Sequence, residues 1–205
     1  MVFNIDVDNT VNNFSEKFLE YYNDITGKHL TMYDLKKYDL TTLGVSRETL
    51  KTLFFNNNAF YRSLDANPIA IGVVKTLWLA DHTINFVTAS DYSIIDSRIE
   101  FIKKYFDFLN VNRSLLITED KGVAYADFVI DDLNGYLVNI NPDCTYILLK
   151  KPWNLTEWNV YRDNPNEDVY ACVDWNDIIS TLHNLKIIDA GDCLREIAKI
   201  TGGDY

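Results

Sequence analysis

The stretch "NIDVDNTV", residues 4–11, places two carboxylates, Asp6 and Asp8, directly after the apolar run "VFNI". Short runs with few polar residues are typical of strands that are covered on both faces, as in a parallel sheet. Two carboxylates this close repel each other unless a cation lies between them. We therefore expect a first buried strand that ends at Asp6, with both carboxylates and a cation beside its end.

Further apolar runs recur along the chain, at residues 83–89, 114–118, 127–131, 145–149 and 169–173. Segments between and after these runs show helical spacing of apolar residues, at residues 68–80, 92–106, after a cap at Asp174, and at about 189–200. The alternation predicts an α/β fold with a doubly wound, mostly parallel sheet in a three-layer α/β/α arrangement.

The connection after the first strand, residues 12–67, is too long for one crossover and has helical patterns of its own. The first pattern stops at Gly27, and a later one begins at a plausible cap, Ser46. One interpretation is an elaborate helical connection. The sharper interpretation is a small helical cap, residues 14–67, inserted into a Rossmann-like core of residues 1–13 and 68–205. Such a cap would stand over the strand ends, where open α/β sheets bind ligands.

Polar residues also follow the second, third and fourth strands, namely Thr88, Lys121, Asp131 and Asp132. We expect them to meet the first strand's carboxylates, because the carboxyl ends of parallel strands share one edge of a sheet. Oxygen ligands without His or Cys suit Mg²⁺, which also binds phosphate oxygens. With a lysine and a hydroxyl nearby, the set matches the needs of a phosphoryl group in transfer.

The motifs stand in the order "DVDNTV" (6–11), "NFVTAS" (85–90) and "DKGVAYADFVIDD" (120–132). In this order they resemble the haloacid-dehalogenase-like phosphohydrolase superfamily, over almost the whole chain. Within that superfamily the sequence resembles the 5'(3')-deoxyribonucleotidases, in the stretches "FYRSLDANPIA" (60–70), "FIKKYF" (101–106), "ITEDKGVAYADFVIDD" (117–132) and "KPWN" (151–154).

The resemblance implies a reaction in which Asp6 attacks phosphorus and forms an aspartyl-phosphate. Asp8 would protonate the leaving oxygen and then act as base for the water that hydrolyses the intermediate. We expect crowding by Asp6 and Asp131 to raise the proton affinity of Asp8, as an acid at neutral pH requires.

The resemblance also implies a set of ligands. Mg²⁺ would be held by the side chains of Asp6 and Asp131 and by the backbone carbonyl of Asp8. Asp132 would orient waters or the lysine from further out. The phosphoryl oxygens would be held by a hydroxyl, a backbone N–H and an ammonium group, those of Thr88, Ala89 and Lys121.

The sequence departs from the family pattern at three positions. Asn9 stands where relatives commonly have Gly, Ala89 where they often have Ser, and Leu133 where they often have Arg. Asn tolerates left-handed backbone, so the turn after the two carboxylates can survive. The other two changes remove a hydroxyl and a guanidinium, so base preference is not carried over from relatives.

Aromatic residues of the 14–67 segment are candidates for contact with a planar base. We single out Phe55 and Phe60, since a flat pocket between cap and core suits a heterocycle. The alternative is that these rings form the core of the cap. Trp153 of "KPWN" either lies near the site or belongs to a structural turn after the fifth strand.

The composition narrows the kinds of partner. A net charge of −11 disfavours a general electrostatic grip on a nucleic acid polymer or an anionic membrane. The three Cys and three His are scattered, which argues against a zinc site and favours buried thiols in a reducing compartment. We expect a cytoplasmic protein with a small-molecule substrate. The sequence does not decide between a monomer and a homodimer.

Three hypotheses follow. The first is a Mg²⁺-dependent phosphatase that hydrolyses deoxyribonucleoside 5'(3')-monophosphates. The second is a related phosphatase for another small phosphate ester, which would share the chemistry of Asp6 and Asp8. The third is a nucleotide-binding regulator that catalyses no reaction. The pair Asp6 and Asp8 argues against it, because a protein that only binds has no use for a second carboxylate that transfers protons.

Overall fold

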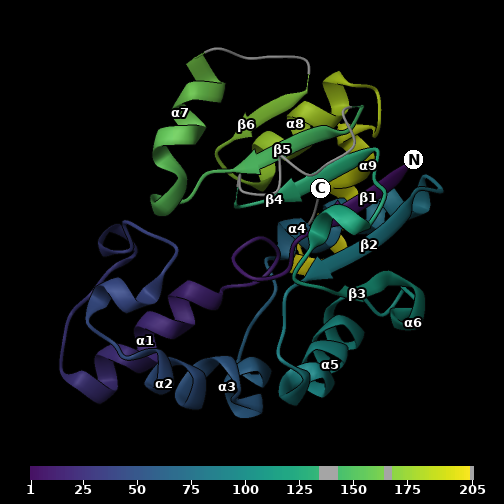
Figure 1. Cartoon of the computed structure of the whole chain (residues 1–205). Helices are drawn as coiled ribbons and strands as arrows, with labels where there is room; N and C mark the ends of the chain where they lie inside the picture. Colours follow the sequence, from purple (N-terminus) through teal and green to yellow (C-terminus); the bar gives the residue numbers. More distant parts are fainter. Residues whose placement is uncertain (134–142, 164–167, 204–205) are drawn as a thin grey trace.

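The computed structural model describes residues 1–133, 143–163 and 168–203, and Figure 1 shows a twisted sheet flanked by helices. The sheet has six strands in the order β3-β2-β1-β4-β5-β6, and each neighbouring pair is parallel. The strands are β1 (Val2–Ile5), β2 (Thr83–Thr88), β3 (Leu115–Ile117), β4 (Phe128–Asp131), β5 (Thr145–Leu149) and β6 (Val169–Cys172). The predicted doubly wound α/β fold is confirmed, with a strand in each of the six apolar runs.

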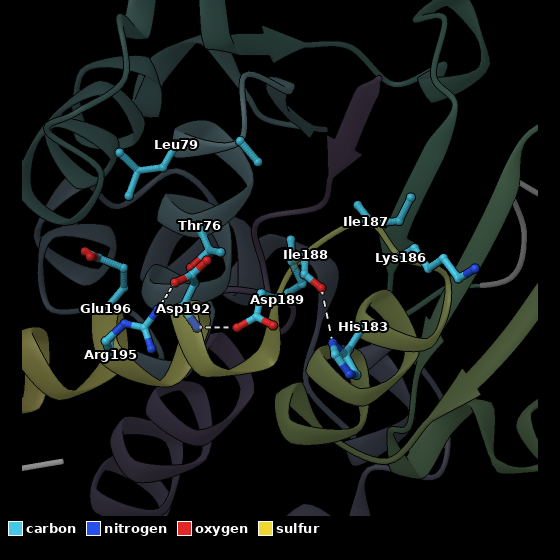
Figure 2. A pocket seen from close by; sticks show the side chains of 11 residues that line it. Thr76, Leu79, His183, Lys186, Ile187, Ile188, Asp189, Asp192, Arg195 and Glu196 are labelled. Atoms are coloured by element: carbon cyan, nitrogen blue, oxygen red, sulfur yellow. Dashed lines mark hydrogen bonds and ion pairs between the residues drawn. The ribbon is translucent and has the colours of Figure 1, made fainter.

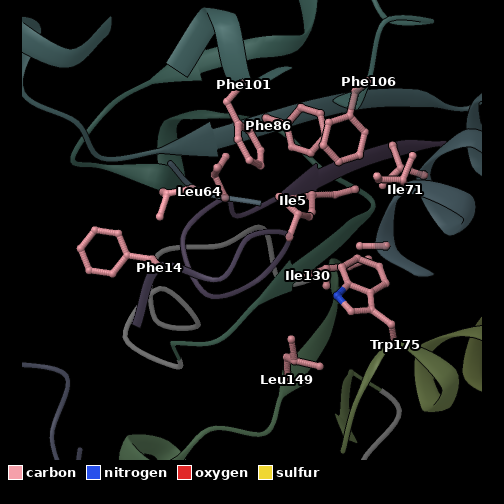
Figure 3. Packing of buried hydrophobic residues seen from close by; sticks show 14 of the residues in the cluster. Ile5, Phe14, Leu64, Ile71, Phe86, Phe101, Phe106, Ile130, Leu149 and Trp175 are labelled. Atoms are coloured by element: carbon pink, nitrogen blue, oxygen red, sulfur yellow. The ribbon is translucent and has the colours of Figure 1, made fainter. Parts of the chain in front are cut away.

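Both faces of the sheet are covered by apolar side chains. On one face, Ile5 and Ile130 pack with Phe86 and with Trp175 of helix α8 (Trp175–Asn184), as Figure 3 shows. On the other face, a separate cluster packs Val129 of β4 and Tyr146 and Leu148 of β5 with Trp158 of α7 (Leu155–Asp163). This two-sided burial explains the near-continuous apolar runs of the strands.

Helices α4 (Pro68–Leu79) and α5 (Ile95–Tyr105) follow the predicted patterns, and α6 (Val111–Ser114) is a short addition before β3. Asp174 caps α8 as expected, accepting a hydrogen bond from the backbone N–H of Asn176 at 2.8 Å. The last helix, α9 (Ala190–Thr201), packs against α4.

The contact between α4 and α9 depends on a glycine. A Cβ on Gly72 would lie 2.3 Å from Cγ1 of Ile197, which is closer than atoms can pack, and 3.1 Å from the backbone nitrogen of Ile197, which is tight. We predict that Gly72→Ala lowers the free energy of unfolding by about 1–3 kcal/mol, because the two helices must separate. Urea denaturation measures this, and in an Ile197→Ala background the cost should shrink; an equal cost in both backgrounds would contradict the explanation.

The segment between β1 and α4 is helical, and Figure 1 shows its helices grouped together beside the sheet. Its elements are α1 (Phe14–Thr26), η1 (Met32–Asp34), η2 (Leu40–Leu43), α2 (Arg47–Leu50), η3 (Lys51–Phe55) and α3 (Asn58–Arg62). Helix α1 ends at Gly27, whose φ is 68°, and Ser46 caps α2 through its hydroxyl, as the sequence predicts.

The chain leaves and re-enters the core at one place. The backbone N–H of Asn67 donates to the carbonyl of Val11 at 2.9 Å, and Asn12 pairs with Ala66 in an antiparallel bridge. An inserted cap requires such adjacent entry and exit points. We retain the division into a cap, residues 14–67, and a core as our interpretation.

Candidate active site

Three buried carboxylates gather at the carboxyl ends of β1 and β4. Asp6 follows β1, and its backbone N–H donates to the carbonyl of Ile130 at 2.9 Å; Asp131 ends β4 and Asp132 comes next. One carboxylate oxygen from each of the three aspartates lies within 4.8 Å of the others. Such a cluster of like charges is costly unless a cation joins it.

Lys121 supplies a cation to this cluster. Its Nζ lies 2.6 Å from Oδ1 of Asp6 and 2.8 Å from Oδ2 of Asp131. Burial alone would lower the pKa of the lysine, but the two carboxylates outweigh burial and hold its pKa above the usual value. The loop after β3 therefore brings a fixed positive charge to the strand ends.

Asp6 sits in an environment that opposes its charge. Burial raises the pKa of Asp6 to about 7, with Asp131 and Asp8 adding to the effect and Lys121 opposing it. Thr10 donates a hydroxyl hydrogen bond to its Oδ2 at 3.1 Å. An additional cation would favour the carboxylate form of Asp6.

The loop that follows Asp6 is held in one conformation. Asn9 has a φ of 63°, the left-handed conformation expected for the residue that stands in place of Gly. Its side-chain oxygen accepts from the backbone N–H of Ser15 at 2.8 Å. The indole N–H of Trp175 donates to the carbonyl of Thr10 at 2.9 Å, which fastens the loop to α8.

Asp8 has a partner that sequence reasoning missed. Arg98 of α5 binds both carboxylate oxygens, with one N–H···O distance of 2.6 Å, and Asn12 donates to Oδ1 at 2.9 Å. Burial, with neighbouring carboxylates adding to it, also raises the pKa of Asp132 well above its usual value. The side chain of Asp8 instead forms an ion pair at the pocket wall.

One signal in the sequence could have found Arg98. It occupies the same face of α5 as Phe101 and Ile102, which are buried, and Ile94, directly before the helix, is buried as well. A charged residue in an otherwise apolar helical stripe requires a partner of opposite charge, because an unpaired buried charge is costly.

The phosphate-binding candidates end β2. Thr88 is buried at the last position of the strand, beside Ile117 of β3 in the sheet register. Its hydroxyl lies 3.4 Å from the carbonyl of Ala89. Ala89 and Ser90 line a pocket together with Asp8, so this turn faces the same space as one of the two predicted catalytic carboxylates.

The pocket has a volume of about 260 Å³ and lies between the 14–67 segment and the strand ends. Its aromatic lining residues come from both sides and are Phe14, Tyr38, Phe55, Tyr61 and Trp153. Asp91 and Glu119 add carboxylates to its lining. Aromatic rings beside polar lining groups can contact a planar group that is attached to a phosphate ester.

The two candidate base contacts lie in different places. Phe55 lines the pocket, whereas Phe60 is 2% exposed and packs edge-on against Phe14 and Phe54. Phe60 therefore belongs to the packed interior of the helical segment, which was the alternative interpretation, and the proposal of a base contact continues with Phe55 alone.

Trp153 combines the two roles considered for it. It lies in the helical turn η7 (Pro152–Asn154), and its indole N–H donates to Oδ2 of Asp132 at 3.0 Å. Its neighbour Asn154 donates to the backbone carbonyls of Asp132 and Leu149, both at 2.8 Å. This turn after β5 thus holds the second aspartate of the pair in place.

A larger cavity, of about 560 Å³, lies at the other end of the sheet (Figure 2). Its lining comes from the end of α4, the turn that joins α8 to α9, and the first turns of α9. The end of α4 leads into the amino end of β2, so this cavity is at the edge opposite the aspartates. It contains none of the three clustered carboxylates, and we assign the chemistry to the smaller pocket.

Comparison with known proteins identifies the family. Residues 1–179 match the family model described as "5' nucleotidase, deoxy (Pyrimidine), cytosolic type C protein". The chain belongs to this family. The matched range covers the strand-end aspartates, Lys121 and the aromatic pocket, and ends within α8. Membership of the cytosolic type C 5' nucleotidases makes the chain a phosphoric monoester hydrolase and confirms the predicted superfamily.

A solved structure supports the same fold. The chain is similar to a HAD family hydrolase from Deinococcus radiodurans R1, whose crystal structure contains phosphate and sodium. The TM-score is 0.59 at 12% identity, with 91% of this chain and 96% of that chain covered. No curated protein matches the chain. Within the described residues, no helix of this nucleotidase family member is long and apolar enough to cross a bilayer.

Proposed function

We propose that the chain is a Mg²⁺-dependent phosphatase that hydrolyses deoxyribonucleoside 5'(3')-monophosphates to nucleoside and phosphate through an aspartyl-phosphate. The observation that supports this most is the convergence of Asp6, Asp131 and Lys121 at one sheet edge, beside an aromatic pocket. Family membership supports the nucleotide as substrate.

The residues at the strand ends fit a divalent cation. They offer only oxygen ligands, and a positively charged group already lies between two of them, since Lys121 Nζ bridges Asp6 and Asp131. Asp6 and Asp131 would hold Mg²⁺ through their side chains and Asp8 through its backbone carbonyl. Asp132, bonded to Trp153, would act from further out. When bound, Mg²⁺ neutralises charge on the phosphoryl oxygens.

The first half of the reaction forms the intermediate. An oxygen of Asp6 attacks phosphorus, a new P–O bond to the aspartate forms, and the P–O bond to the nucleoside breaks. The electron pair of the broken bond stays on the nucleoside oxygen, which takes a proton from Asp8. Lys121, Thr88 and the backbone N–H of Ala89 hold the phosphoryl oxygens during the transfer.

The second half restores the enzyme. A water attacks phosphorus while Asp8 takes one of its protons, and the P–O bond to Asp6 breaks. The products are inorganic phosphate and the free Asp6 carboxylate, and Asp8 again carries the proton needed for the next turnover. Asp8 thus acts as acid in the first half and as base in the second, while Asp6 gains and then loses the phosphoryl group.

The pocket suits one mononucleotide better than a polymer, because it is small and the chain carries a net charge of −11. We predict that Phe55→Ala raises KM for deoxyribonucleoside monophosphates by about 5- to 100-fold through loss of base stacking, with little change for p-nitrophenyl phosphate. Steady-state kinetics on both substrates measures the difference.

Phe60→Leu is the matched control for the Phe55 prediction. Phe60 is buried among other rings, so its substitution should lower the melting temperature and leave the ratio of the two KM values unchanged. A change in that ratio for Phe60→Leu, and none for Phe55→Ala, would contradict the assignment of the base contact.

A panel of phosphate esters tests the proposed substrate. It contains dUMP, dTMP, dGMP, UMP and sugar phosphates, each with Mg²⁺ and with EDTA. We expect Mg²⁺-dependent phosphate release with a preference for deoxyribonucleotides. Equal rates on sugar phosphates would favour the related phosphatase, and release that persists in EDTA would refute the metal requirement.

A further inference from the structure

We infer that Arg98 is a positioning residue that orients Asp8 for the hydrolysis of the phosphorylated enzyme. This inference rests on the proposed function, because it acts through the carboxylate that transfers protons in both halves of the reaction. It concerns a residue of α5 that none of the sequence motifs contains.

The contact between Arg98 and Asp8 is bidentate. Two N–H groups of the guanidinium reach the two carboxylate oxygens, one of them at 2.6 Å. Paired parallel hydrogen bonds fix the plane and the rotation of a carboxylate, which one point contact does not. Asn12 adds a third hydrogen bond at 2.9 Å, on the oxygen Oδ1. Asp8 is therefore held in one orientation at the pocket wall.

Arg98 itself is held from three sides. Its Nε donates to Oγ of Ser90 at 2.9 Å, and its guanidinium carbon lies 4.3 Å from the ring centroid of Tyr61. The Arg98 side chain is only 2% exposed. Ser90 comes from the turn after β2 and Tyr61 from α3, and both line the pocket, so Arg98 joins three parts of the pocket wall around Asp8.

Burial makes this arrangement expensive as a purely structural device. Replacing a buried ion pair by apolar residues of similar volume is often neutral or stabilising. An exposed pair, Arg62 with Glu100 at 2.7 Å, ties α3 to α5, and neither of its residues lines the pocket. The buried pair instead joins α5 to the loop after β1, and its carboxylate is the predicted proton-transfer group.

A substrate whose leaving group needs no proton distinguishes a positioning role of Arg98 from a role in folding. With p-nitrophenyl phosphate the departing p-nitrophenolate needs no proton, so only the hydrolysis of the aspartyl-phosphate depends on Asp8. Arg98→Ala should therefore show a burst of p-nitrophenolate, close to one per enzyme, followed by steady turnover at least about tenfold slower than in the unsubstituted enzyme. Stopped-flow absorbance measures both phases.

Chemical rescue and a matched substitution sharpen the test. Added guanidinium should restore the slow phase of Arg98→Ala in a saturable manner, and Arg98→Lys should recover it only in part, because an ammonium cannot bind both oxygens. Arg62→Ala, which removes the exposed pair, should keep the unsubstituted kinetics. Unchanged rates in Arg98→Ala, a smaller burst with unchanged rates, or no rescue would each overturn the inference.

A spectroscopic measurement that needs no substrate tests the contact between Arg98 and Asp8 independently of the proposed function. In ¹⁵N NMR spectra, a guanidinium that is hydrogen-bonded through both of its Nη atoms rotates slowly and gives resolved Nη signals. Asp8→Asn should abolish the resolved signals of Arg98; signals that persist would overturn the ion pair. The proposed function fails in a different way, if p-nitrophenyl phosphate is hydrolysed and no nucleoside monophosphate is.

Discussion

Asp6→Asn is expected to reduce phosphate release by at least about 10⁴-fold, because an amide oxygen cannot serve as the nucleophile that forms the aspartyl-phosphate. The loss should appear in kcat for every substrate, p-nitrophenyl phosphate included. Release of inorganic phosphate from dUMP, followed with a coupled assay, measures it. The substitution nearly preserves the volume of the side chain, so the packing around β1 should change little.

The state of folding is the control for Asp6→Asn. Ile130 accepts a hydrogen bond from the backbone of residue 6, and this bond does not depend on the side chain. We therefore expect a circular dichroism spectrum like that of the unsubstituted protein. A folded Asp6→Asn protein that still releases phosphate at more than about one hundredth of the normal rate would assign the nucleophile elsewhere.

Lys121→Met is expected to lower kcat by about 10²- to 10³-fold, the usual cost of losing one charged contact to the transferring group. It should also destabilise the protein in EDTA by about 3 kcal/mol, because Asp6 and Asp131 lose the buried cation between them. Mg²⁺ should recover more stability in this variant than in the unsubstituted protein. Urea denaturation with EDTA and with Mg²⁺ measures both effects.

Lys75→Met is the matched control. Lys75 pairs with Glu196 at 3.1 Å, away from the strand-end aspartates, and its side chain is 32% exposed. Its loss should cost less than about 1 kcal/mol and should not depend on Mg²⁺. If Lys121→Met behaves like Lys75→Met in both measurements, the proposed role of Lys121 as the cation between Asp6 and Asp131 is wrong.

The sheet could be predicted from the sequence because each strand is covered on both faces and therefore reads as a short apolar run. The positions of Asp6, Asp131 and Lys121 followed from the same pattern, since carboxyl ends of parallel strands share an edge. The left-handed conformation of Asn9 was expected from the resemblance, because relatives commonly have Gly at this position. The strands and the residues at their ends depend on local sequence and on topology, and the pattern of apolar runs indicates both.

Contacts between distant side chains could not be predicted in this way. Arg98 lies 90 residues from Asp8, and only the packing of α5 against the pocket brings the two together. Phe55 and Phe60 are close in sequence, yet Phe55 lines the pocket and Phe60 is buried, because η3 and helix α3 face different neighbours. Helix α7 was missed because its apolar stripe is weak and Trp158 is its one buried residue.

A burst experiment with Asp8→Asn and p-nitrophenyl phosphate in Mg²⁺ tests most directly whether Asp6 carries the phosphoryl group. We predict rapid release of one p-nitrophenolate per enzyme, followed by slow turnover, because the water that attacks the intermediate has lost its base. Mass spectrometry of the quenched protein should then find one phosphoryl group on the peptide that contains Asp6. Release without a burst, or a phosphoryl group on any other residue, would contradict it.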